Sequence, residues 1–205
     1  QGLIWKKSTE LLSNEEILRL ANIFATMGIT KLRLTGGEPL VRKDLPELVQ
    51  ELSKIKQLHT IAMTTNGILL ADHAKQLKAS GLNALNISLD TFKKDRFAAI
   101  TGSDQLKVVL NGIHSALSCQ FESIKLNVVV MAGINDDEVL DFVDFAKANN
   151  VKVRFIEYMP FKDNHWSKDR VVTYKTLKTQ IESVHRLFPV LAKAGEVAKE
   201  YNLEG

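Results

Sequence analysis

The sequence predicts an α/β domain organised as an incomplete barrel, with parallel strands inside and helices outside. Five short segments rich in β-branched and aliphatic residues are typical of buried strands. Segments with helical periodicity separate them, so that successive strands begin roughly 25 to 40 residues apart, the length of a strand–helix unit. Polar residues recur at the carboxyl end of each strand segment. A barrel gathers those ends on its catalytic face, which favours it over a doubly wound sheet.

The expected elements follow one another without a linker or a low-complexity segment. The first helix opens on a capping-box pattern, in which Ser13 is followed three residues later by Glu16. The expected strands cover residues 31–37, 60–67, 84–90, 124–133 and 151–160. The interval between the third and fourth strands has room for two helices, at about residues 93–100 and 104–118.

Composition narrows the class of protein. The chain has 205 residues, of which 45% are hydrophobic and 25% charged, as in an ordinary globular protein. A net charge of +3 is too small to indicate a nucleic-acid partner, and no apolar run approaches a membrane span. The single cysteine, Cys119, excludes an internal disulfide and suits a reducing compartment. Because the chain begins on Gln1, we expect a central piece of a longer protein, with residues 173–205 starting a C-terminal region.

Four of the strand-end residues are cations, namely Lys31, Arg33, Lys125 and Arg154. Side chains alternate along a strand, so Lys31 and Arg33 share one face, and Lys125 shares a face with Asn127. Several cations inside a barrel are unfavourable unless an anion neutralises them. The set therefore favours a polyanionic ligand that carries phosphate, which arginine binds as a planar fork and lysine as a point charge.

Two other interpretations of these cations stay open. Glu38, Asp90 and Glu157 could neutralise them in a solvated network, and some of the cations could point outward. For any single cation, neutralisation by an acid or an outward orientation is the better interpretation. The recurrence of cations on successive strands, however, favours a ligand.

The turn after the first strand reads GGEP, at residues 36–39. An ordinary strand-to-loop turn would explain the two glycines and the proline. At a barrel mouth, however, backbone groups together with the Glu38 carboxylate could also hold the ammonium of a ligand. The turn has neither the spacing of a phosphate loop nor that of a dinucleotide fingerprint. The five histidines are scattered without metal-ligand spacing, and we assign no metal site.

Five motifs in order carry a resemblance to a known family. LRLTGGEPLVR, TTNGI, LNISLDT, KLNVVVM and VKVRFIEYMPF together resemble the radical S-adenosylmethionine superfamily. Within it, the chain is most similar to the GTP 3′,8-cyclase family, also called molybdenum cofactor biosynthesis protein A. The resemblance covers nearly the whole chain and implies an incomplete TIM-like barrel, here without its first strand and its C-terminal domain.

The resemblance also implies a chemistry. Family members bind one 4Fe–4S cluster on three N-terminal cysteines and use it to cleave S-adenosylmethionine reductively. The resulting radical takes hydrogen from C3′ of GTP, and C3′ then closes onto C8 of guanine. A second 4Fe–4S cluster on C-terminal cysteines holds the guanine. The product, 3′,8-cyclo-7,8-dihydro-GTP, leads to molybdopterin.

The family's binding residues map onto matching positions of this chain. The resemblance implies that Gly36, Gly37, Glu38, Ser88 and Met159 contact S-adenosylmethionine, with Glu38 receiving the methionine ammonium. It further implies that GTP contacts Arg33, Thr64 and Lys125, with Lys31 and Arg154 as further triphosphate cations. It gives no catalytic side chain.

Both cysteine motifs of the family are missing from this chain, and Cys119 matches neither. We therefore expect this piece alone to be inactive and the longer protein to be a cyclase. The resemblance implies a homodimer, located in the cytoplasm or, in animals, in mitochondria. Two alternatives remain: another radical enzyme of the peptide-modifying type, and a non-catalytic relative that binds nucleotides.

Overall fold

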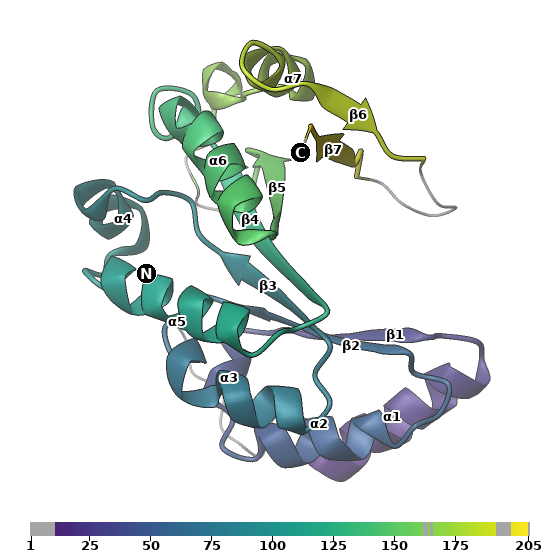
Figure 1. The fold of residues 1–205 in the computed structure, drawn as a ribbon. Helices are drawn as coiled ribbons and strands as arrows, with labels where there is room; N and C mark the ends of the chain where they lie inside the picture. The colour runs from purple at the N-terminus through teal and green to yellow at the C-terminus, as the bar shows by residue number, and fades with distance from the viewer. Residues whose placement is uncertain (1–10, 162–163, 165, 192–197, 205) are drawn as a thin grey trace. The chain divides into compact units, whose positions relative to one another are not determined.

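Strands and helices alternate along the chain, as the sequence predicts. The computed structural model describes residues 11–161, 164, 166–191 and 198–204. The elements up to the fifth strand are α1 Asn14–Thr26, β1 Lys31–Leu34, α2 Leu45–Ser53, β2 Thr60–Thr65, α3 Leu70–Ala79, β3 Ala84–Ser88, α4 Lys94–Thr101, α5 Leu106–Ser118, β4 Ser123–Val130, α6 Val139–Asn149 and β5 Lys152–Glu157. Helix α7 Tyr174–Glu182 and an antiparallel pair, β6 Leu187–Pro189 and β7 Tyr201–Leu203, follow (Figure 1). All five expected strands form, and two helices separate β3 from β4.

The chain divides into two compact units. Unit 1 comprises Gln1–Ile87 and Lys107–Ile124, and unit 2 comprises Ser88–Leu106 and Lys125–Gly205. The single domain that the sequence predicts, with a C-terminal region from about residue 173, stays a prediction. In the part of the chain that the structure describes, no helix is both long and apolar enough to cross a membrane.

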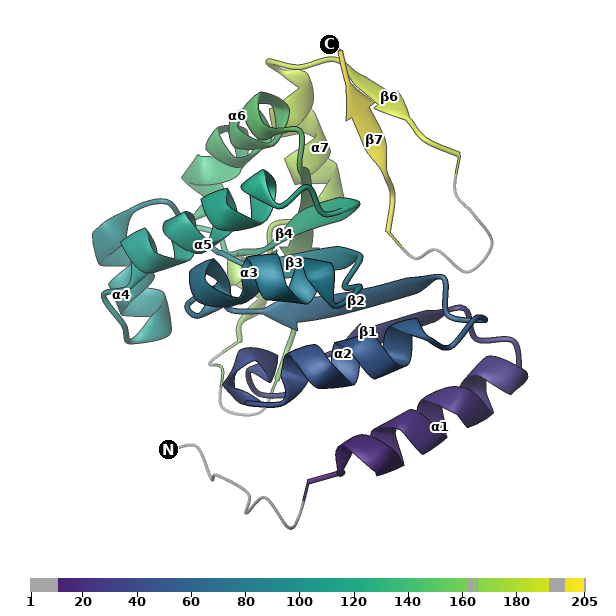
Figure 2. The ribbon, with the colours of Figure 1, turned by 60° about the horizontal axis from the view of Figure 1, so that its bottom comes forward.

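In unit 1 three parallel strands form in the order β1, β2, β3. Leu32 pairs with Ile61, and Met63 with Leu85 in the next strand. Helices α1, α2 and α3 lie along one side of β1 and β2 (Figure 2). On β2 and β3 the side chains of Ile61, Met63, Leu85 and Ile87 are buried. The register places a second set of residues on the opposite face of these strands: Lys31, Arg33, Ala62, Thr64, Ala84 and Asn86.

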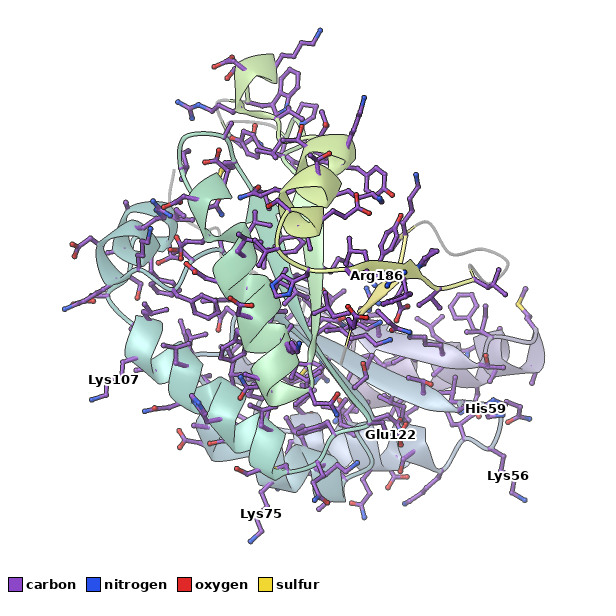
Figure 3. The ribbon with its side chains drawn as sticks, turned by 45° about the horizontal axis from the view of Figure 1, so that its top comes forward. Lys56, His59, Lys75, Lys107, Glu122 and Arg186 are labelled. Atoms are coloured by element: carbon purple, nitrogen blue, oxygen red, sulfur yellow. The ribbon has the colours of Figure 1, made fainter. Side chains whose placement is uncertain are left out.

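The starts of the unit 1 strands are joined by side chains. Asn83 accepts a hydrogen bond from the Ile61 backbone N–H at 2.7 Å, and its own Nδ2 donates to Glu122 at 2.8 Å. Glu122 is labelled in Figure 3, close to the start of β4. The first bond satisfies a backbone N–H near the start of β2, and the second holds the Asn83 side chain in place.

In unit 2 strands β4 and β5 pair in parallel, with Asn127 opposite Arg154. Alternate β4 side chains, Leu126, Val128 and Val130, are buried. Helix α6 packs on β5, where the Phe142 ring meets Phe155 edge-on at a centroid distance of 6.4 Å. One face of β4 is therefore apolar, and the other is left for polar residues.

A buried carboxylate fixes the segment that follows β3. Glu138 is fully buried and accepts hydrogen bonds from the Thr91 hydroxyl at 2.6 Å and from the Phe92 N–H at 2.7 Å. Arg96 also bonds to Glu138 and neutralises it. Arg96 and Lys93 bond to the neighbouring Asp137 as well, and they lower the pKa of its carboxyl group to about 2. A buried charge is tolerated here because it is paired and hydrogen-bonded.

Helix α5 packs directly against the turn that follows β2. A Cβ atom placed on Gly112 would lie 2.6 Å from the carbonyl oxygen of Gly67, so only glycine fits at this contact. We expect Gly112→Ala to lower the free energy of unfolding by about 1–3 kcal/mol, because backbone must move. Asn111→Ala, at the exposed neighbouring position, is the matched control and should change it by less than about 0.5 kcal/mol. Denaturant unfolding measures both, and equal effects would contradict the contact.

Candidate cofactor and nucleotide site

The GGEP turn directly follows β1 and leads into the short 3-10 helix Pro39–Val41. Gly36 has φ +154°, a backbone conformation that favours glycine. Gly37 does not have a positive φ, and a Cβ atom built on it would find no atom within 4 Å. Neither backbone conformation nor packing within the described chain explains the missing side chain of Gly37. The open space beside it is suited to a ligand that approaches the backbone.

The Glu38 carboxylate joins this turn to the end of β2. Oε1 accepts hydrogen bonds from the Leu40 N–H at 3.1 Å and from the Thr65 hydroxyl at 2.7 Å. Oε2 accepts one from the Asn66 N–H at 2.7 Å. Sequence reasoning missed this arrangement, because Glu38 and Thr65 are 27 positions apart. The expected role of Glu38 in binding a ligand ammonium stays a prediction. The structure adds a second role, in which Glu38 holds the turn after β1 against the end of β2.

The expected nucleotide residues of unit 1 share one strand face. Lys31 and Arg33 alternate with Leu32 along β1, as predicted, and both are exposed. Arg33 pairs with Ala62, which places it on the same face as Thr64, two residues further along β2. Among the described residues, neither Lys31 nor Arg33 makes a side-chain ion pair or hydrogen bond. The geometry leaves two cationic side chains available to a ligand beside the half-buried Thr64.

The three acids that could have neutralised the cations bind backbone amides instead. Glu38 is held as described above, Asp90 accepts from the Val129 N–H at 2.8 Å, and Glu157 accepts from the Tyr174 N–H at the start of α7 at 2.7 Å. Among the described residues, none of these acids forms an ion pair with Lys31, Arg33 or Arg154. This outcome favours the ligand interpretation.

In unit 2 a buried asparagine ties the segment after β3 to the end of β4. Asn135 is 2% exposed, and its Nδ2 donates to the carbonyl oxygens of Asp90 at 2.7 Å and Val129 at 2.8 Å. Its Oδ1 accepts from the Met131 N–H at 2.7 Å. These bonds fix the backbone two residues after Ser88, which is exposed at the end of β3. The sequence indicated only a helix start near Asn135, and its role was missed.

The polar face of β4 and β5 holds the other expected triphosphate residues. Lys125 and Asn127 lie on one face of β4, as predicted, and Asn127 is opposite Arg154. The Oδ1 atom of Asn127 is buried and receives no hydrogen bond from the described residues. A buried acceptor without a donor is unfavourable by about 1–3 kcal/mol. A ligand that brings a hydroxyl or amino donor would relieve this, which a bare phosphate cannot do.

The remaining expected residue, Met159, is 47% exposed just after β5. Its carbonyl oxygen accepts a hydrogen bond from Asn164 Nδ2 at 2.8 Å. The structure thus places the expected residues in two groups. Unit 1 holds Lys31, Arg33, Gly36, Gly37, Glu38 and Thr64, and unit 2 holds Ser88, Lys125, Arg154 and Met159.

The described residues contain no group of three or more histidine, cysteine or acidic side chains that could hold a metal ion. Cys119 is a free, half-buried thiol just after α5. The expectation that this chain supplies no metal ligands stays a prediction.

Comparison with known proteins adds to the geometry. The family described as "Radical SAM superfamily" matches residues 4–146. The chain is 41% identical over 207 residues to a GTP 3′,8-cyclase of Lactiplantibacillus plantarum, covering all of this chain and 62% of that protein. It is 42% identical over 209 residues to human molybdenum cofactor biosynthesis protein 1, covering all of this chain and 32% of that protein. The chain thus spans less than two thirds of these relatives.

Solved structures show the same fold at low identity. Streptococcus suis SuiB matches with a TM-score of 0.71 and 16% identity, over 86% of this chain and 41% of that one. Methylornithine synthase matches with a TM-score of 0.64 and 18% identity, over 84% of this chain and 52% of that one. The expected fold class, α/β with an incomplete TIM-like barrel of this type, is confirmed.

Substitutions at the two glycines separate backbone strain from ligand space. Gly36→Ala should lower the free energy of unfolding by about 1–3 kcal/mol, because alanine rarely adopts its φ. Gly37→Ala should change it by less than about 0.5 kcal/mol, since its Cβ atom meets open space. In the longer protein, Gly37→Ala should nevertheless weaken binding of S-adenosylmethionine. Calorimetric titration and denaturant unfolding test this, and a Gly37→Ala variant that unfolds easily yet binds normally would contradict it.

Burial raises the pKa of the Asp90 carboxyl group, although its bond from Val129 opposes the shift. The folded chain then binds this proton more tightly than the unfolded chain, so the stability that the protonated carboxyl gives is lost as pH rises. Asp90→Asn retains an acceptor without a charge. Its free energy of unfolding should rise relative to that of the native chain as pH increases from about 4, the usual aspartate value. Denaturant unfolding at several pH values measures this, with Asp95→Asn at an exposed position as the control. A difference in the free energy of unfolding between Asp90→Asn and the native chain that did not change with pH would refute the prediction.

Proposed function

Since the chain belongs to the radical SAM superfamily, we propose that it is the central part of a GTP 3′,8-cyclase. That enzyme converts GTP to 3′,8-cyclo-7,8-dihydro-GTP, the first step of molybdenum cofactor biosynthesis. The observation that carries the proposal is a strand face with two cations, Lys31 and Arg33, that pair with no other described side chain and lie beside the glycine turn at Gly37. The named cyclases at about 41% identity support the same function.

The substrate's triphosphate accounts for the cations. A guanidinium forms two parallel hydrogen bonds with phosphate, and an ammonium adds a compact charge, so Arg33 and Lys31 would bind and orient the triphosphate. Thr64, on the same face, would donate its hydroxyl proton. On the polar face of β4 and β5, Lys125 and Arg154 would serve the same ligand. Asn127 Oδ1 then calls for a donor, and a nucleotide has such donors in its ribose hydroxyls and its base.

The residues of the GGEP turn fit S-adenosylmethionine. When bound, this cofactor supplies the radical that starts the reaction. Gly37 leaves room for the methionine end to approach the backbone, and the Glu38 carboxylate, held by amide donors, offers acceptor capacity for its ammonium. Gly36, Ser88 and Met159 would complete the binding residues. The protein's contribution is to orient the two ligands and to exclude competing reactions.

This chain does not fit an iron–sulfur cluster. Three thiolates hold such a cluster with one iron open, and the sequence has one cysteine, Cys119. We infer that the ligands of one 4Fe–4S cluster, and of a second in the longer protein, lie outside this chain. This chain alone is then inactive.

The cellular setting belongs to the same proposal. We expect a homodimer in the cytoplasm, or in mitochondria when the source is an animal. The Arabidopsis thaliana relative is named mitochondrial, so we extend the mitochondrial expectation to a plant source. Neither nucleic acid nor membrane is proposed as a partner.

The longer protein should turn GTP into the cyclised product under anaerobic conditions with S-adenosylmethionine and a reductant. Arg33→Ala should raise the Kd for GTP by roughly 10- to 100-fold, since charge-assisted hydrogen bonds to phosphate are lost. Lys56→Ala is the matched control, because this exposed side chain of unit 1 points away from the fold (Figure 3), and it should leave Kd unchanged. Mass spectrometry identifies the product and calorimetry measures Kd. An Arg33→Ala variant with native affinity would contradict the site, and the absence of product would contradict the function.

A further inference from the structure

Strand β2 ends in two threonines that serve opposite sides of the strand. Thr64 is half-buried and lies on the face that also carries Arg33. Thr65 points the other way and is 2% exposed. Sequence reasoning assigned Thr64 to GTP and gave Thr65 no role, so the buried hydroxyl of Thr65 needs an explanation.

The direction of each hydrogen bond at Thr65 is fixed by its neighbours. The Gly67 N–H can only donate, so Thr65 Oγ1 accepts from it, at 3.0 Å. A hydroxyl has one proton, and that proton is then available for Glu38 Oε1, at 2.7 Å. The short chain therefore runs from the Gly67 amide through the Thr65 hydroxyl to the Glu38 carboxylate, with every group in the polarity it prefers.

This chain of bonds determines where the Glu38 carboxylate lies. Oε1 has Thr65 and the Leu40 N–H as donors, and Oε2 has the Asn66 N–H. Thr65 is the only donor among these that comes from a side chain, so it is the one that a substitution can remove. Without it, the carboxylate would keep two amide donors but lose one of the three bonds that hold its orientation, at the oxygen atom that it shares with Leu40.

We propose that Thr65 is a positioning residue for the S-adenosylmethionine end of the site. Its hydroxyl holds the Glu38 carboxylate, and through it the backbone of the Gly37 turn, in the arrangement that receives the amino-acid part of the cofactor. This inference rests on the proposed function. Adjacent threonines then serve two ligands: Thr64 faces the nucleotide, and Thr65 supports the cofactor from behind.

The test uses the longer protein with its clusters reconstituted. Thr65→Val keeps the shape and the β-branch but removes the hydroxyl, and Thr65→Ser restores a hydroxyl. We expect Thr65→Val to raise the Kd and the KM for S-adenosylmethionine by about tenfold, which is typical for a lost hydrogen bond to a charged group. The Kd for GTP and kcat at saturating cofactor should stay within about twofold. Thr65→Ser should recover native values.

Two controls separate positioning from a general loss of structure. Thr179→Val, at an exposed position of α7 away from the named site residues, should change neither Kd. If Thr65→Val does not fold, Thr65→Ala takes its place as the test variant, because it removes the hydroxyl and introduces no larger group. In a Glu38→Ala background, Thr65→Val should add less than twofold to the Kd for S-adenosylmethionine, because Glu38→Ala already removes the acceptor of the Thr65 hydrogen bond.

Three results would overturn the inference. They are native cofactor affinity in folded Thr65→Val and Thr65→Ala, equal losses for GTP and cofactor, and a failure of Thr65→Ser to restore binding. A native protein that binds neither GTP nor S-adenosylmethionine would instead overturn the proposed function. The two failures are therefore distinguishable.

Discussion

The carboxylate of Glu38 is the interaction on which the candidate site depends. It satisfies two backbone amides and one buried hydroxyl at once, and so fixes the glycine turn after β1 to the end of β2. A carboxylate that accepts from several donors is firmly held in its position. The turn can therefore have open space beside Gly37 and still be held in place, because the bonds of the neighbouring Glu38 fix it.

The same use of acids recurs in unit 2, with a consequence for the cations. Asp90 and Glu157 bind backbone N–H groups, as Glu38 does in unit 1. Acids that fix backbone do not neutralise Lys31, Arg33 or Arg154. Among the described residues these three cations thus have no acidic partner, which is consistent with their proposed role in binding phosphate.

Local and periodic features of the fold could be predicted from the sequence. The capping box at Ser13 and Glu16 forms as expected, because both partners lie within one helical turn. Patterns of a few residues predict the strand positions and the two helices between β3 and β4. They also predict the alternation of Lys31 and Arg33 with apolar residues along β1. The candidate site residues at strand ends were chosen from the same patterns, and their roles stay predictions.

Contacts between distant segments could not be predicted. No local pattern connects Glu38 to Thr65, or Glu138 to Thr91, because the partners are set by register and by helix packing. Asn135 was invisible for the same reason, since an asparagine before a helix normally indicates only a helix start. Family motifs suggested the ligands proposed for the site, whereas the residues that support it could be identified only from the structure.

A crystal structure of the longer protein with S-adenosylmethionine bound would test the central claim most directly. The account predicts that the Gly37 backbone contacts the methionine end while Glu38 keeps its hydrogen bonds from Thr65 and Asn66. A structure in which the Glu38 carboxylate has left both donors, or in which the cofactor lies away from Gly37, would contradict it.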